Sequence, residues 1–187
     1  MKLPIVAYGD PVLKKVCVNI DETYPDLQQL ISNMFETMNN ANGVGLAAPQ
    51  IGLPIRLFIV DTKADEEEGE EVFKKVFINA QILEESGEPW AFNEGCLSIP
   101  EVREDVMRKP NILISYYDEN WKPHKEKVSG FAARVIQHEY DHIEGKLFTD
   151  RLSLLRKQLL KGKLDAISKG NVHTDYKMRY PKQNRRK

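Results

Sequence analysis

The sequence is poor in cysteine and has no long apolar run. Its two cysteines, Cys17 and Cys96, are too few to form a disulfide scaffold. No stretch approaches the roughly 20 consecutive apolar residues that a membrane-spanning helix needs. Residues 1–15 also lack the apolar core of a signal peptide, because Pro4 and a turn at residues 9–11 interrupt them. These absences lead us to expect a cytoplasmic protein with no membrane partner.

Net charge is almost absent, but the charges are unevenly distributed. The 187 residues include 27 Lys and Arg against 28 Asp and Glu, so the formal net charge is -1. From Arg151 to Lys187 there are 12 basic residues and only two acidic ones, whereas residues 65–71 are strongly acidic. A basic end is typical of proteins with an anionic partner, but a solvated helix face followed by a loose tail has the same composition. The acidic stretch suggests no role.

The length and composition fit one domain with an apolar core, since 41% of the residues are hydrophobic and 29% are charged. Apolar periodicity predicts helices near residues 25–42, 131–144 and 152–167. Alternation and turn signals predict strands at residues 55–61, 75–83, 102–108, 111–118 and 121–128. Residues 93–100 are too rich in small and polar side chains for regular structure. Strands grouped between helices predict an α+β domain over residues 1–170, followed by a polar, basic and mobile tail at 171–187.

The sharpest motif is HExxH at residues 138–142, within the second predicted helix. Histidines four residues apart lie one above the other on a helix, so His138 and His142 can reach a single metal ion. A metal lowers the pKa of a bound water molecule to about 7, and Glu139 is close enough to take the proton of that water. Two packed or exposed histidines without a metal are the alternative. The metal is favoured, because half of the chain's four histidines fall in this motif.

A catalytic metal site usually has three protein ligands and a water molecule, so a third ligand is needed. A metalloprotease pattern with a third histidine fails because Phe148 occupies that position, and no glutamate follows Glu144. Upstream, Cys96 lies in a small-residue loop at 94–98 and can offer a thiolate, whereas Cys17 reads as a small core residue. Three weaker candidates remain downstream, namely Asp150, Asp165 and His173.

Three segments together resemble the peptide deformylase family: residues 43–50 (GVGLAAPQ), 94–98 (EGCLS) and 138–142 (HEYDH). Their order and spacing are specific, and the resemblance extends over about residues 3–165. It implies antiparallel β-sheets surrounding a central metal-binding helix, with an N-terminal and a C-terminal helix. It also implies a metal-dependent hydrolase that removes the formyl group from the N-terminal formylmethionine of nascent polypeptides and releases formate.

The same resemblance implies roles for individual residues. It implies three metal ligands, Cys96, His138 and His142. A water molecule completes the coordination, and the metal is most often Fe²⁺, which Zn²⁺, Ni²⁺ or Co²⁺ can replace. Glu139 is the general acid and base, while the side chain of Gln50 and the backbone N–H of Leu97 stabilise the oxyanion. The implied substrate contacts are Gly43, Val44, Gly45, Glu94, Phe131, Arg134 and Val135.

Two basic residues bear on the shape of the implied site. Relatives often carry an apolar residue where this chain has Arg134, so its guanidinium either lies at the pocket mouth or pairs with a carboxylate. Glu94 and Arg108 match a pair that supports the site in relatives, and we expect an ion pair between them.

Relatives also use a C-terminal helix to dock near the ribosomal exit tunnel. The basic segment 151–187 therefore suggests the ribosome as a partner bound by charge, without a motif for sequence-specific nucleic-acid binding. Because no transit peptide is evident, a bacterial cytoplasm is favoured over an organelle. Two other functions stay open from the residues alone. One is a metallopeptidase with the same helix motif and a third ligand other than Cys96, and the other is a protein with a closed structural metal site.

Overall fold

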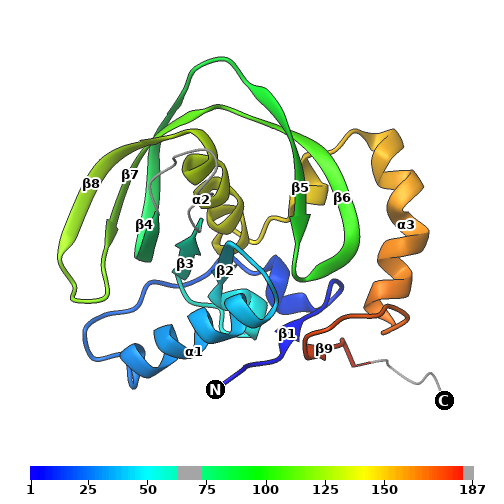
Figure 1. The fold of residues 1–187 in the computed structure, drawn as a ribbon, viewed down its shortest axis with the longest axis horizontal. Coiled ribbons are helices and arrows are strands. Elements are labelled where there is room, and N and C mark those ends of the chain that lie inside the picture. The colour runs from blue at the N-terminus through cyan, green and yellow to red at the C-terminus, as the bar shows by residue number, and fades with distance from the viewer. Residues whose placement is uncertain (63–72, 183–187) are drawn as a thin grey trace.

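The structure, a computed structural model, describes residues 1–62 and 73–182. The acidic stretch noted at residues 65–71 lies outside the described residues. Helix α2 (Gly130–Ile143) runs through the middle of the molecule, with strands on either side of it (Figure 1). Its buried side chains include the charged groups of Arg134, Glu139 and Asp141. A helix at the surface would turn such groups to solvent, so α2 is a central element that carries polar chemistry inside the fold.

A five-stranded antiparallel sheet covers one side of α2, in the order β2-β3-β4-β7-β8. The strands are β2 (Gly45–Ala47), β3 (Leu57–Asp61), β4 (Lys74–Ser86), β7 (Asn111–Tyr117) and β8 (Pro123–Ser129). Strand β3 is buried along its whole length, which matches its continuous apolar sequence. An apolar cluster between the sheet and α2 contains the stacked rings of Phe58 and Phe77, whose centroids lie 4.7 Å apart.

A two-stranded hairpin, β5 (Trp90–Cys96) and β6 (Ile99–Arg108), covers the other side of α2 (Figure 1). This corrects the expectation that residues 93–100 lack regular structure. The backbone ladder of a hairpin forms without apolar side chains, and polar residues on its outer face pair across the strands. Asn93, for example, donates to Asp105 and accepts from Arg103, over 2.9 Å in each case.

The two outer helices pack against different parts of this core. Helix α1 (Leu27–Asn40) buries Ile31, Met34 and Met38 in a cluster with β3 and β4, and its bounds agree with the predicted helix. Helix α3 (Leu154–Ser168) lies outside β6 and buries only one narrow stripe (Figure 1). The prediction of an α+β fold with antiparallel sheets around a central helix is confirmed. None of the helices in the described residues has the length and apolar character needed to span a membrane.

The chain after α3 returns to the body of the protein. Strand β9 (Met178–Arg179) pairs in parallel with β1 (Ile5–Val6), so the two ends of the chain lie side by side (Figure 1). The expectation of a loose tail from residue 171 therefore does not hold for this strand. The expectation fails because β9 is held by backbone hydrogen bonds, and these cannot be predicted from a high content of basic residues. Positions 183–187 of that predicted tail lie outside the described residues.

Candidate metal centre and active site

Three side chains with metal-binding atoms meet between α2 and the hairpin. Cys96 Sγ lies 3.3 Å from His142 Nε2, and one donor atom from each of Cys96, His138 and His142 lies within 4.8 Å of the other two. The two histidines stand one helical turn apart, with ring centroids separated by 5.2 Å. The downstream alternatives are not part of this cluster. Asp150 binds Lys14, Asp165 binds Lys169, and His173 is exposed near Asp175.

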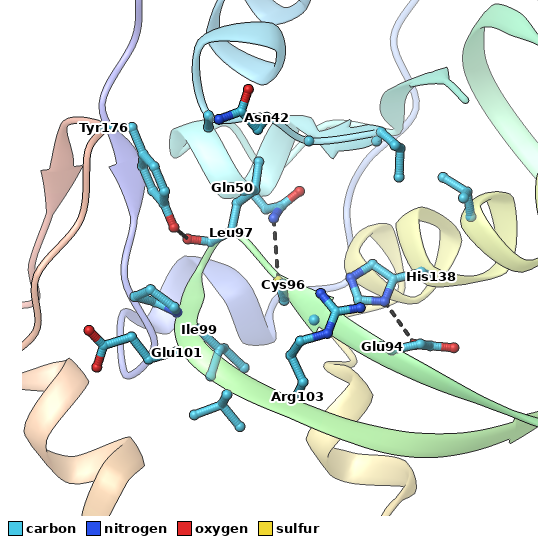
Figure 2. A pocket seen from close by; sticks show the side chains of 18 of the residues that line it. Asn42, Gln50, Glu94, Cys96, Leu97, Ile99, Glu101, Arg103, His138 and Tyr176 are labelled. Atoms are coloured by element: carbon cyan, nitrogen blue, oxygen red, sulfur yellow. Dashed lines mark hydrogen bonds and ion pairs between the residues drawn. The ribbon is translucent and has the colours of Figure 1, made fainter. Parts of the chain in front are cut away.

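Glu94 of β5 orients the first histidine. Its Oε2 lies 3.0 Å from His138 Nδ1, which leaves Nε2 as the nitrogen available to a metal (Figure 2). Arg108 donates to the two oxygens of Glu94 over 2.7 and 3.0 Å, so the expected ion pair is present and buried. Burial opposes ionisation of Glu94, but hydrogen bonds from His138 and Arg108 hold the pKa of its carboxyl well below the ordinary value.

Of the two placements expected for Arg134, at the pocket mouth or paired with a carboxylate, the structure shows the pair. Its Nη1 donates to Glu94 Oε1 over 3.0 Å, and its guanidinium lies 4.6 Å from the ring centroid of Trp90. The side chain is only 2% exposed, yet it also lines the cavity of the site. Glu94 therefore lies between two guanidinium groups, and its negative charge is compensated by ion pairs inside the protein.

The side-chain amide of Gln50 lies beside the cluster, close to the turn that follows Cys96. The Gln50 Oε1 accepts from the N–H of Ala47 over 2.8 Å, so its amide nitrogen must point the other way. That nitrogen lies 3.5 Å from Cys96 Sγ (Figure 2). It also lies 3.4 Å from Ser98 Oγ. Leu97 forms the turn between β5 and β6, next to Cys96 in the chain.

Glu139 reaches the site from the same helix as the histidines. Its Oε2 is buried and has no hydrogen-bond partner among the described residues, an uncommon state for a carboxylate oxygen. Burial raises the pKa of Glu139 to about 7, and His138 opposes that shift. Gly45 lies directly against this carboxylate, since a Cβ there would stand 2.5 Å from Glu139 Oε1. Glycine at this position therefore makes room for the acid.

The donor set suits a divalent metal ion. Two imidazoles and a thiolate are ligands that iron, zinc, cobalt and nickel accept. Burial lowers the pKa of His142, so its ring is neutral, which is the form that binds a metal. The unpartnered oxygen of Glu139 fits a water molecule held beside such an ion. Within the described residues this cluster offers three candidate ligands, the number typical of an open catalytic site, whereas a closed structural site usually has four.

A cavity of about 600 Å³ opens above this cluster. Every residue expected to contact substrate lines it: Gly43, Val44, Gly45, Glu94, Phe131, Arg134 and Val135. Residues that were not expected to contact substrate also line it, among them Asn42, Arg103 and the segment 173–176. A sequence signal for that segment exists. From Val172 to Tyr180, polar residues alternate with inward-facing ones, a period of two that indicates a half-buried extended chain.

A histidine pair on a buried helix, a thiol within reach, a nearby acid and a deep cavity define a metal-dependent hydrolase. Comparison with known proteins makes the class specific. Residues 2–158 match the model of the family described as polypeptide deformylase. The peptide deformylase of Christiangramia forsetii is 64% identical over 97% of this chain and 97% of its own length. That of Flavobacterium psychrophilum is 58% identical over 96% of this chain and 97% of its own length.

A solved structure agrees with these relatives. The crystal structure of a peptide deformylase from Legionella pneumophila superposes with a TM-score of 0.80 at 36% identity, covering 91% of this chain and 98% of that one. The chain belongs to the polypeptide deformylase family. It is thus a metal-dependent enzyme that removes the formyl group from the N-terminal methionine of nascent polypeptides, as the resemblance of its three motifs implied.

Proposed function

We propose that Cys96, His138 and His142 together hold one divalent metal ion, and that this ion is Fe²⁺ in the cell. The observation that carries the proposal is the convergence of the three donor atoms within 4.8 Å. Their chemistry also accepts Zn²⁺, Ni²⁺ or Co²⁺. Metal analysis of the anaerobically purified protein tests the identity of the ion, and a predominance of zinc would contradict the assignment to iron.

The surrounding residues have separate tasks in hydrolysis of the formyl amide. When bound, the ion supplies Lewis-acid activation of a water molecule. Glu139 takes a proton from the attacking water on its unpartnered Oε2 and delivers it to the leaving amine, so that formate and a free N-terminus result. The amide of Gln50 and the N–H of Leu97 donate to the formyl oxygen as it gains negative charge.

The cavity accounts for recognition of formylmethionine. Val44, Phe131 and Val135 offer an apolar wall for the methionine side chain. The cavity wall at Gly43 and Gly45 lets the main chain of the substrate come close. Gly43 packs tightly there, because a Cβ on it would stand 2.9 Å from Leu97 Cδ1. The paired guanidinium of Arg134 presents little free charge to this wall, which keeps it suitable for an apolar side chain.

Formate release from a short formyl-Met peptide tests the role of Glu139. We expect Glu139→Gln to lower kcat by at least about 100-fold, because the proton carrier is lost while the shape beside Gly45 is kept. The bound metal, measured in the same samples, is expected to stay at the wild-type level. Turnover close to wild type in this variant would show that another group carries the proton. Cleavage of unformylated peptides at a comparable rate would favour a metallopeptidase instead.

We propose further that the enzyme acts in the bacterial cytoplasm and reaches its substrate at the ribosome through its C-terminal part. Not all of the basic side chains in this part are free to bind phosphate, because some form ion pairs within the protein. Arg151 and Arg156 are engaged with Asp141 and Glu104. Lys161 and Lys163 on α3 are exposed and have no ion pair among the described residues. Contact with ribosomal phosphates would therefore rest on these lysines more than on the arginines.

A further inference from the structure

The turn that follows Cys96 is held by the two ends of the chain. Strand β1 lies between this turn and β9. On one side the N–H of Tyr8 donates to the carbonyl of Ser98 over 2.9 Å. On the other side the N–H of Ala7 donates to the carbonyl of Arg179 over 2.9 Å. The C-terminal segment is thus connected to the active-site turn through a single intervening strand.

A second link from the C-terminal segment reaches the turn directly. The hydroxyl of Tyr176 donates to the carbonyl oxygen of Leu97 over 2.8 Å, a contact between residues 79 positions apart in the chain (Figure 2). The ring of Tyr176 packs in the same apolar cluster as the Leu97 side chain. Burial raises the pKa of Tyr176, so the hydroxyl remains a donor. Thr174 shapes the segment, because its hydroxyl donates to the carbonyl of Tyr176 over 2.8 Å.

We infer that Tyr176 is a positioning residue for deformylation, which holds the Leu97 peptide so that its N–H points at the formyl oxygen. This inference rests on the oxyanion role proposed above for Leu97. The carbonyl that Tyr176 binds belongs to the peptide immediately after that N–H. Cys96 pairs with Ile99 across the turn, and the carbonyl of Ser98 accepts from Tyr8. The Tyr176 contact restrains the carbonyl between them, that of Leu97. A donor fixed in advance stabilises a developing charge without reorganising.

Tyr176 also belongs to the cavity wall, which sets it apart from a residue that only stabilises the fold. Residues 173–176 line the cavity on the side of Leu97, and Figure 2 shows Tyr176 beside Leu97 and facing it. The same side chain therefore contacts both the turn that carries the donor and the space that the substrate enters. Loss of its hydroxyl should change the geometry of the turn while leaving the wall in place.

The test compares Tyr176→Phe with Tyr180→Phe. Tyr180 is a matched control, because it lies in the same alternating segment and its hydroxyl has no hydrogen bond within the described residues. We expect Tyr176→Phe to lower kcat for a formyl-Met peptide about tenfold, since a small misplacement of one donor costs that much or more. KM should stay within about twofold, because the phenyl ring still lines the cavity. Tyr180→Phe should match the wild type in both constants.

A second readout reports on the turn itself. In the zinc-loaded proteins, the ¹⁵N order parameter of the Leu97 amide should fall from about 0.85 towards 0.6 in Tyr176→Phe only. An unchanged order parameter would overturn the inference, whatever happens to the rate. A lower order parameter with an unchanged kcat would also overturn it, and would place the error in the oxyanion role proposed for Leu97. Absence of formate release by the wild type would instead discredit the proposed function as a whole.

Discussion

At the scale of single residues, one buried carboxylate joins a candidate metal ligand to two buried arginines. Glu94 contacts His138, Arg108 and Arg134, and its side chain is only 4% exposed. Two guanidinium groups share its charge, so neither is left uncompensated in the interior. The same contacts orient the imidazole whose other nitrogen is available to a metal. Stability and metal binding therefore depend on the same side chain.

Replacement of Glu94 by glutamine tests this dependence. We expect Glu94→Gln to lower the free energy of unfolding by about 3–5 kcal/mol, because the buried guanidinium of Arg134 loses its counter-charge and that of Arg108 keeps only Asp141. Metal affinity should fall by about 10-fold to 100-fold. Asp165→Asn, which breaks the exposed pair with Lys169, should cost less than about 1 kcal/mol. Equal losses in the two variants, measured by urea unfolding, would contradict the account.

At the scale of elements, the sheet carries a polar link far from the active site. Glu126 of β8 accepts from Lys75 of β4 over 2.7 Å and from the hydroxyl of Tyr116 of β7 over 2.7 Å. Burial raises the pKa of Glu126, but these two partners outweigh it and lower the pKa below the ordinary value of 4.5. A depressed pKa in the folded state means that the carboxylate stabilises the fold above the unfolded pKa, and loses this effect as pH falls through the folded pKa.

The link predicts how one variant responds to acid. Near pH 7, Glu126→Gln should be less stable than wild type by about 1 kcal/mol or less, because a third of the glutamate side chain is exposed and water screens the pair. The difference should shrink as the pH falls from about 4.5 through the lower pKa of the folded carboxylate, because the unfolded chain takes up the proton first. Urea unfolding at steps between about pH 7 and pH 3.5 provides the measurement. A difference that grows on acidification would refute the sign of the effect.

At the scale of the whole molecule, the outer helix α3 presents exposed apolar and basic side chains away from the catalytic centre. Leu154, Leu155 and Leu159 are all more than half exposed, and Lys161 and Lys163 follow on the same helix. Residues 173–182 continue from this helix back to β1 and the turn after Cys96. The surface proposed to meet the ribosome is thus part of one continuous segment with the wall of the active site.

The ribosome proposal predicts a change in binding without a change in chemistry. We expect Lys161→Glu with Lys163→Glu to weaken pelleting with ribosomes about tenfold or more at low salt, since each lost phosphate contact removes counterion release. Hydrolysis of a short formyl-Met peptide should be unaltered. Lys125→Glu with Lys127→Glu on β8 makes the same change in net charge at another exposed site and should pellet like the wild type. Equal loss in both double variants would indicate a general charge effect.

The local part of this protein could be predicted from the sequence. The spacing of His138 and His142 determines that both rings share one helix face, because a helix repeats every 3.6 residues. The bounds of α1 and β3 followed from apolar patterns of the same local kind. The residues 93–100 were misjudged as irregular, because a hairpin ladder leaves little apolar signal in its sequence.

Other features were decided only by the tertiary structure. The thiol of Cys96 contacts a histidine 46 positions away in the chain. The guanidinium of Arg134 pairs with Glu94 and does not lie free at the pocket mouth. The alternating segment from 172 to 180 packs against the turn at Leu97. These contacts join segments distant in the chain. They form only when α2, the hairpin and the two terminal segments pack together. The helix and strand propensities of single residues do not determine that packing.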